Sequence, residues 1–272
     1  MVPVVALLHT TDRIDWMHWT VHPSTVIGIA ALGALYAWRA RAVGNAGPTP
    51  AQRAAFALGL VVLFTALNGP IHDLSDSYLF SVHMVQHLLL TMLVTPLLII
   101  GTPALMLRGA LAHPRVFAVA KRVTTAPAAF LLFNVTLVAW HLPPLYNLAM
   151  RNHDVHIVQH LCFLVTSVLM WWPLLSRVPE LPALSRPLQL LYICLLMIPM
   201  SVIGMIITYA DEVLYPAYES APRMWSLSPL EDQLLGGLIM WIPGSLIYIA
   251  LLTIVFFRWA KETDAEESAS VA

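Results

Sequence analysis

The chain has 272 residues, of which 59% are hydrophobic and only 11% are charged. With a mean hydropathy of +0.75, this composition is far from that of soluble domains and is typical of an integral membrane protein. The net charge of −1 gives no basic surface for nucleic acid, and the two cysteines, Cys162 and Cys194, form no Cys-x-x-Cys motif. Composition therefore excludes nucleic-acid binding and leaves histidine as the main residue that could hold a metal.

Apolar stretches fill most of the chain. Residues 1–23 are expected to be an extracytoplasmic lead-in, because they lack the basic start and the cleavage site of a signal peptide. A membrane-spanning helix needs about 20 mostly apolar residues. Seven stretches meet this requirement and form one predicted domain, 24–257: they are 24–41, 52–68, 79–107, 124–141, 155–175, 187–209 and 234–257. The third contains Pro96 and Pro103, which predict a kink or break.

The basic residues predict how the spans are oriented. Eleven of the 14 Lys and Arg residues fall in the loops on one side, and basic loops stay in the cytoplasm. The sequence therefore predicts an all-α integral membrane bundle of seven transmembrane helices, with the N-terminus outside and the C-terminus cytoplasmic. Residues 258–272 would form a cytoplasmic acidic tail, which we expect to be disordered.

This topology places almost all of the histidines on the outer side of the membrane. Ten of the 11 fall in outer loops or near outer helix ends, and only His113 is on the cytoplasmic side. Three pairs have a spacing of four residues: His18/His22, His83/His87 and His156/His160. The second and third pairs lie in the phrases VHMVQHL (82–88) and VHIVQHL (155–161), which are identical at six of seven positions.

The repeated phrase has the spacing of a metal chelate. Residues four apart lie on one face of a helix, so each phrase presents two imidazoles to one point. The third and fifth spans run in the same direction, which places both phrases at the same depth. We therefore predict one shared site, with His83, His87, His156 and His160 within roughly 8 Å across the two helices and His141 bordering it.

Other polar residues have simpler interpretations. His9, His18, His22 and His72 are expected to be interfacial polar residues, and whether the last three or His153 join the site is left open. Gln86 and Gln159 are expected to bond between helices or to orient the histidines. The methionines could offer thioether to Cu(I), although packing is the favoured role: Met84, Met92, Met197, Met200 and Met205.

Acidic residues are confined to the ends of the spans and the loops. No Asp, Glu, Lys or Arg lies near the middle of a predicted span, which disfavours coupled transport. The outer acids, Asp73 and Asp76 among them, could orient histidine ring nitrogens or attract a cation, but most are expected to be solvated loop charges. Glu231 and Asp232, at the start of the seventh span, are the expected exceptions.

Four stretches resemble the polytopic CtaG family of cytochrome c oxidase assembly factors: FSVHMVQHLLLTMLVTPLLIIGTPALMLR, AWHLPPLYNLAM, VHIVQHLCFLVTSVLMWWPLL and DQLLGGLIMWIPGSLIY. The resemblance implies a multi-pass protein of the bacterial plasma membrane that helps to mature a haem-copper oxidase by handling copper at its outer face. Its partner would be an oxidase subunit or another copper carrier. Carried over residue by residue, the family motifs mark the same five histidines: His83, His87, His141, His156 and His160.

The favoured function is thus copper binding or delivery rather than enzymatic catalysis. Among the divalent first-row metals copper generally binds most tightly, but imidazole nitrogens are also good ligands for zinc. One alternative is a membrane zinc hydrolase in which three histidines hold the metal and an open position activates water, with Ser81 and Asp73 near His83. Another is a haem-binding membrane protein with axial histidines from two helices.

Overall fold

The computed structural model describes residues 19–271, and within this range the regular secondary structure is helical, with no strands. The α-helices are α1 (Pro23–Ala42), α2 (Pro50–Leu67), α3 (Pro70–Ser77), α4 (Phe80–Leu88), α5 (Thr95–Gly101), α6 (Ala104–Leu111), α7 (Pro114–Val123), α8 (Ala126–His141), α9 (Pro143–Arg151), α10 (His153–Leu175), α11 (Arg186–Thr208) and α12 (Pro229–Val271). Short 3-10 turns occur at Gly44–Ala46 and Pro216–Tyr218, and a π-helical segment, Leu89–Val94, joins α4 to α5.

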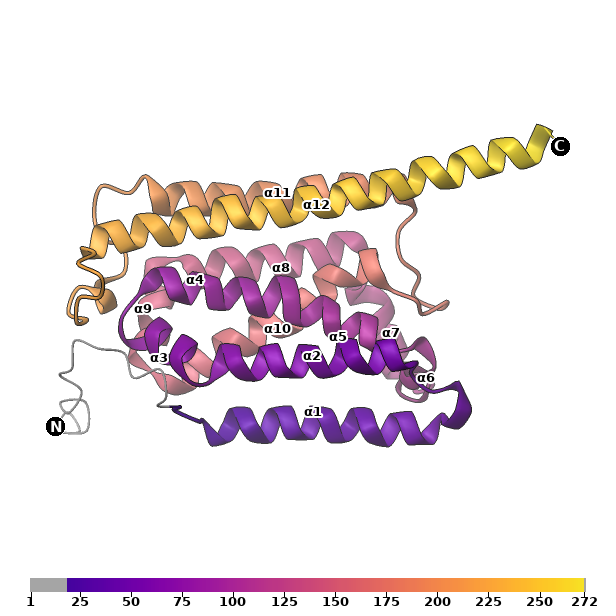
Figure 1. Ribbon diagram of the computed structural model, residues 1–272, viewed down its shortest axis with the longest axis horizontal. Helices are drawn as coiled ribbons and strands as arrows, with labels where there is room; N and C mark the ends of the chain where they lie inside the picture. Colours follow the sequence, from indigo (N-terminus) through magenta and orange to yellow (C-terminus); the bar gives the residue numbers. More distant parts are fainter. Residues whose placement is uncertain (1–18, 272) are drawn as a thin grey trace.

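The long helices lie roughly side by side in a bundle (Figure 1). Helices α11 and α12 pair along one edge of the bundle, and α1 forms the opposite edge against α2. The α11–α12 pair approaches closely at Gly204 and Gly237, since a Cβ atom at Gly204 would lie 3.1 Å from the Gly237 carbonyl oxygen. Small residues of this kind let two membrane helices pack backbone against backbone.

Several helices are long and apolar enough to cross a membrane. Five described helices meet this requirement, and a sixth span results if α7 and α8, which meet at a bend of 74°, are counted as one. The predicted stretch 24–41 coincides with helix α1, which is not among these five. For residues 19–271 the structure thus confirms an all-helical fold with apolar helices typical of a multi-pass membrane protein.

The predicted irregularity in the third span is confirmed. Pro96 has no N–H to donate, and the π-helical segment directly precedes it. Carbonyl groups of the preceding turn accept side-chain hydrogen bonds, since the Thr95 hydroxyl donates to Leu90 O at 2.8 Å and the Trp171 indole donates to Thr91 O at 2.7 Å. The helix then ends at Gly101, two residues before Pro103.

A tight turn places α3 inside the end of the bundle where α4 begins. Gly69 joins α2 to α3 with φ of 67°, a backbone conformation that favours glycine. Pro70 then starts α3 at a position where a missing N–H costs nothing. As a result α3 packs against α4 and carries His72 and Ser75 into buried positions.

The predictions for the two ends of the chain have different outcomes. Most of the N-terminal lead-in, including His9 and His18, lies outside the described residues. The expectation of a disordered acidic tail is wrong, because helix α12 continues without a break from the apolar segment to Val271. This tail contains Ala and Glu, which favour helix, and extends a helix that is already nucleated.

Candidate metal centre

The two repeated phrases face each other at one end of the bundle. His83 and His87 lie on α4, and His156 and His160 lie on α10. Between the two helices, the ring centres of His83 and His156 are 5.3 Å apart, and those of His87 and His160 are 5.7 Å apart. All four side chains are buried. The predicted proximity of the four histidines is therefore confirmed.

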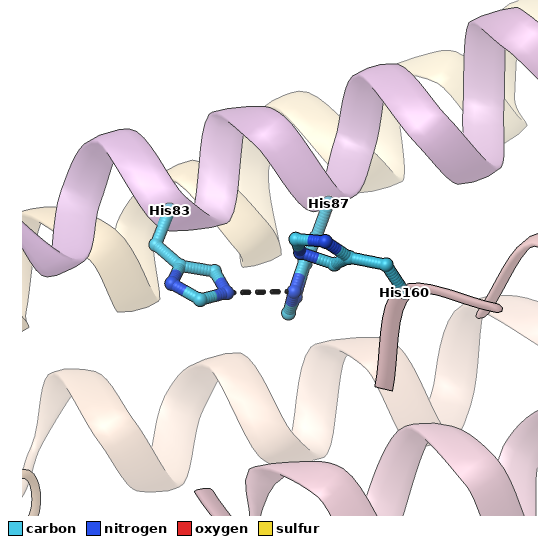
Figure 2. A group of neighbouring side chains, drawn as sticks. All are labelled: His83, His87 and His160. Carbon is cyan, nitrogen blue, oxygen red and sulfur yellow. Dashed lines mark hydrogen bonds between the residues drawn. The ribbon is translucent and has the colours of Figure 1, made fainter. Parts of the chain in front are cut away.

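Within this cluster, two groups of three residues have the spacing of a metal site. Ligand atoms of His83, His87 and His160 all lie within 4.8 Å of one another, and so do those of Asp76, His83 and His156. Figure 2 shows His83 and His87 descending from one helix and His160 reaching toward them from another. Nitrogens sharing one metal at about 2.0–2.1 Å lie slightly closer together, so modest side-chain rotation would complete either group.

Asp76 and His72 are part of this cluster, which corrects two predictions. Asp76 Oδ2 lies 3.3 Å from His156 Nδ1 and 3.4 Å from His72 Nε2, so one oxygen contacts two imidazoles. Asp76 is thus not a solvated loop charge, and His72 is buried rather than interfacial. The signal for both was the spacing of four between them on a short amphipathic helix, α3.

The surroundings of α3 fix the charges on these two groups. Burial lowers the pKa of His72, although the Asp76 carboxylate acts in the opposite direction. Burial acts to raise the pKa of Asp76, but the hydrogen bond with His156 and the neighbouring imidazoles bring this pKa well below its usual range. The centre therefore contains an ionised carboxylate beside neutral His72.

Tyr218 fixes where the proton of His83 lies. Burial raises the pKa of the Tyr218 hydroxyl well above its usual range, so this hydroxyl keeps its single proton, which it donates to Ser75 O at 2.8 Å. His83 Nδ1, 3.1 Å from the same hydroxyl, must then be the donor. The neutral ring carries one proton, so His83 Nε2 presents a lone pair.

Neighbouring groups also orient the rings of His87, His141 and His156. His87 Nε2 lies 2.8 Å from His83 Nε2 and donates to its lone pair, which leaves His87 Nδ1 unprotonated. His141 Nδ1 donates to Leu137 O at 2.7 Å, and His156 Nδ1 faces the Asp76 carboxylate. Metal-binding histidines are typically held in this way, with one ring N–H on a carbonyl or carboxylate and the other nitrogen free.

The free nitrogens have no protein partner. Four buried imidazole nitrogens lack a hydrogen bond within the described part of the chain: His87 Nδ1, His141 Nε2, His156 Nε2 and His160 Nε2. A buried polar atom left in this state typically costs about 1–3 kcal/mol. Four ring nitrogens without a protein partner thus gather in one buried cluster, where a metal ion could bind them.

His141 borders the cluster beside His87. Its ring centre lies 5.7 Å from that of His87, but it belongs to neither group of three. His87 and His141 also line a small cavity of about 20 Å³, together with Met84, Met92, Met200 and Met240. Sequence reasoning named the first three of these methionines but not Met240, and Met197 and Met205 do not line the cavity.

The two glutamines differ. Gln86 donates to Ala66 O of α2 at 2.7 Å and contacts His72 Nδ1 at 3.3 Å, which confirms the expected bond between helices. Gln159 is equally buried, yet neither atom of its amide has a partner among the described residues. The expectation for Gln159 is therefore wrong in this structure.

Asp232 supports the site from α12. Its carboxylate accepts hydrogen bonds from the backbone N–H groups of Phe80 and Ser81 at 2.7 and 3.1 Å, and from the Ser81 hydroxyl at 2.5 Å. It thus caps the N-terminus of α4, where a negative charge is favourable. Asp232 is therefore not a solvated loop charge, as expected, whereas the same expectation for Glu231 is wrong, because Glu231 is exposed and its carboxylate accepts hydrogen bonds from Ser228.

With this geometry in view, comparison with known proteins identifies the chain. The family model described as cytochrome c oxidase caa3 assembly factor (Caa3_CtaG) matches residues 31–262. The chain belongs to the Caa3_CtaG family. The matched range contains all five predicted histidines as well as Asp76 and Tyr218.

Three mycobacterial proteins are similar to this Caa3_CtaG chain. The uncharacterized proteins Mb0105 of Mycobacterium bovis and MT0111 of Mycobacterium tuberculosis are each 28% identical to it over 283 residues, covering 96% of this chain and 41% of theirs. The uncharacterized protein ML1998 of Mycobacterium leprae is 26% identical over 246 residues, covering 82% and 36%. The chain thus spans about two fifths of the length of these relatives. No solved structure matches it.

Proposed function

We propose that this protein acts in the assembly of cytochrome c oxidase by binding copper at the histidine cluster of α4 and α10. The observation that carries the proposal is the set of four buried imidazole nitrogens without a protein partner. Copper is the cargo, received from or passed to an oxidase subunit or another carrier. Membership of the family supports a role in oxidase assembly, and the imidazole donor atoms support copper as the metal.

The chemistry of the donor set suits copper. Neutral imidazole is a good ligand for copper and zinc, whereas thioether sulfur favours Cu(I). His83, His87 and His160 offer three nitrogens, and the methionine-lined cavity adjoins them at His87. For a metal held by His83, His87 and His160, the single proton of His87 moves from Nε2 to Nδ1, so that His87 binds through Nε2 and not through Nδ1.

Metal analysis of protein purified without a histidine tag tests this proposal. We expect copper in a fixed ratio to protein, and we expect its loss in His83→Ala. His113→Ala is the matched control, because His113 is exposed at the start of α7, at the other end of the bundle (Figure 1). Wild-type protein that neither contains nor takes up copper would refute the proposal.

The same preparation separates copper binding from the alternatives. Zinc in place of copper, together with hydrolysis of an amide substrate, would support a membrane hydrolase. A strong visible absorption band from porphyrin would support a haem protein. We expect neither.

The orientation of the protein completes the proposal. We infer seven spans, formed by α1, α2, α4 with α5, α8, α10, α11 and α12, in a bacterial plasma membrane. With the basic loops in the cytoplasm, the histidine cluster lies near the outer face. Reporter fusions after Asn45 and Asp264 should score as cytoplasmic and one after Glu219 as external. The reverse pattern would place the cluster at the cytoplasmic face.

The cellular role is tested by removing the gene. Deletion should lower the activity of assembled cytochrome c oxidase, and added copper should restore part of it. Complementation by His113→Ala but not by His83→Ala would link the defect to the cluster. Normal oxidase levels in copper-poor medium after deletion would contradict a role in assembly.

A further inference from the structure

A second group of histidines lines a large open cavity beside the cluster. The cavity measures about 400 Å³ and is lined by residues of α1, α2, α3 and α10 and by His22, which precedes α1. Its inner wall is apolar, with residues such as Ile29, Leu63 and Leu164. Five histidines line it as well: His22, His72, His153, His156 and His160. The last two belong to the buried cluster, so the cavity reaches the candidate metal centre from outside.

These histidines form a continuous series of ring contacts. The ring centre of His22 lies 5.6 Å from that of His153 and 4.5 Å from that of His72. His72 in turn lies 6.3 Å from His156, and His156 lies 5.3 Å from His83. Ring spacings within the buried trio of His83, His87 and His160 run from 4.4 to 5.9 Å. The outer contacts of His22 thus have the same spacing as the buried trio.

Exposure falls steadily along this series. His153 is exposed, His22 is half-buried, His72 is 8% exposed and His83 is fully buried. A hydrated metal ion could therefore contact the first two rings directly but could reach His83 only after losing its water. Exchange of water for imidazole one ligand at a time is the ordinary way to meet this requirement.

Asp76 connects the outer rings with the inner ones. Its Oδ2 atom contacts both His72 and His156, so a single carboxylate oxygen lies where the outer group ends and the cluster begins. A negative charge at this point attracts a cation into the cavity and offers an oxygen ligand between two nitrogens. It also belongs to the inner group of Asp76, His83 and His156.

We propose that His22, His72 and His153 form an access site that takes up copper from outside and passes it through Asp76 and His156 to the buried cluster. The inference rests on the proposed copper function and adds a second, outer binding site to it. Copper keeps its oxidation state throughout, because the transfer is an exchange of ligands. The access site binds more weakly than the cluster, since water completes its coordination.

Copper titration and rapid mixing of the full chain test the access site. The variant His22→Ala/His153→Ala should bind one fewer equivalent of copper ion, losing the weaker one. It should also load the buried cluster about tenfold more slowly, because the ion is no longer concentrated beside Asp76 before it enters. His113→Ala is the control and should match the wild type in both measurements. Both replaced side chains are at least partly exposed, and an unchanged melting temperature would verify folding.

The two proposals fail in different ways. If the double variant binds and loads copper like the wild type, the access site is refuted while the buried centre stands. His83→Ala should lose the tight equivalent and keep the weak one. If wild-type protein binds no copper at all, the proposed function itself is refuted. Loss of both equivalents in the double variant would contradict the access site, because it predicts that the cluster still fills.

Discussion

The phrases on α4 and α10 share six of seven residues, yet their surroundings differ. The α4 copy is enclosed: His83 is fully buried, bonds to Tyr218 and His87, and has Gln86 anchored to α2. The α10 copy forms a wall of the outer cavity, with His156 and His160 lining it. Gln159, the counterpart of Gln86, has no partner among the described residues.

This difference means that the same seven-residue motif lies in two different environments. Spacing of four puts both imidazoles of each copy on one face, and this is the same for both. The neighbouring elements then decide which nitrogen carries the proton and which reaches the cavity. If the proposed copper function holds, the α4 copy would hold the metal and the α10 copy would also receive it.

Removing one histidine from each copy should lower copper affinity by unequal amounts. His83 belongs to both groups of three ligands, whereas His156 belongs to one. His83→Ala should therefore lower copper affinity by more than about 100-fold, beyond the loss caused by removing an orienting group alone. His156→Ala should cause a smaller loss, because His83, His87 and His160 remain. Competition with a chromogenic chelator measures both, and equal losses would contradict the distinction.

Replacing Asp76, which contacts His156 of the α10 copy, should have the second-largest effect on copper affinity. Asp76→Asn removes the charge that faces His156 Nδ1 and His72 Nε2, so we expect affinity to fall by about 10–100-fold. Asp73→Asn is the matched control on the same helix, since Asp73 accepts a hydrogen bond from the Thr20 hydroxyl. Similar affinities for the two variants would show that Asp76 does not orient the ligands.

Tyr218 should act through the α4 copy. Tyr218→Phe leaves His83 Nδ1 without its acceptor and should lower copper affinity by about tenfold. Tyr248→Phe is a control of the same chemistry, because Tyr248 is also fully buried and its hydroxyl has no partner within residues 19–271. An equal effect of both replacements would indicate a general loss of packing instead.

Replacing the two glutamines should have the smallest effect, and this effect is on the free energy of unfolding rather than on copper affinity. Gln86→Leu removes a donor to Ala66 O and should lower the free energy of unfolding by about 1 kcal/mol. Gln159→Leu removes an amide with no partner and should leave this free energy unchanged or raise it. Thermal unfolding of the detergent-solubilised variants compares the two. A greater loss for Gln159→Leu would reverse the comparison.

The sequence by itself determined the helical membrane class, the family and the residues that gather at one end. These follow from local properties: apolar runs of sufficient length, prolines at 96 and 103, and histidines repeated at the period of a helix face. The breaks in the third span were predictable for the same reason. The helical tail to Val271 was not, because its composition suits both a solvated coil and the extension of an existing helix.

Only the tertiary structure decided the contacts that give these histidines their chemistry. Tyr218 meets His83 across 135 residues of chain, and no pattern in the sequence links them. His72 and Asp76 became part of the centre because the turn at Gly69 folds α3 against α4. Gln86 and Gln159 are alike in sequence and differ only in what packs beside them. Hydrogen bonds and proton positions depend on neighbours within about 3 Å, and such neighbours are set by the packing of distant segments.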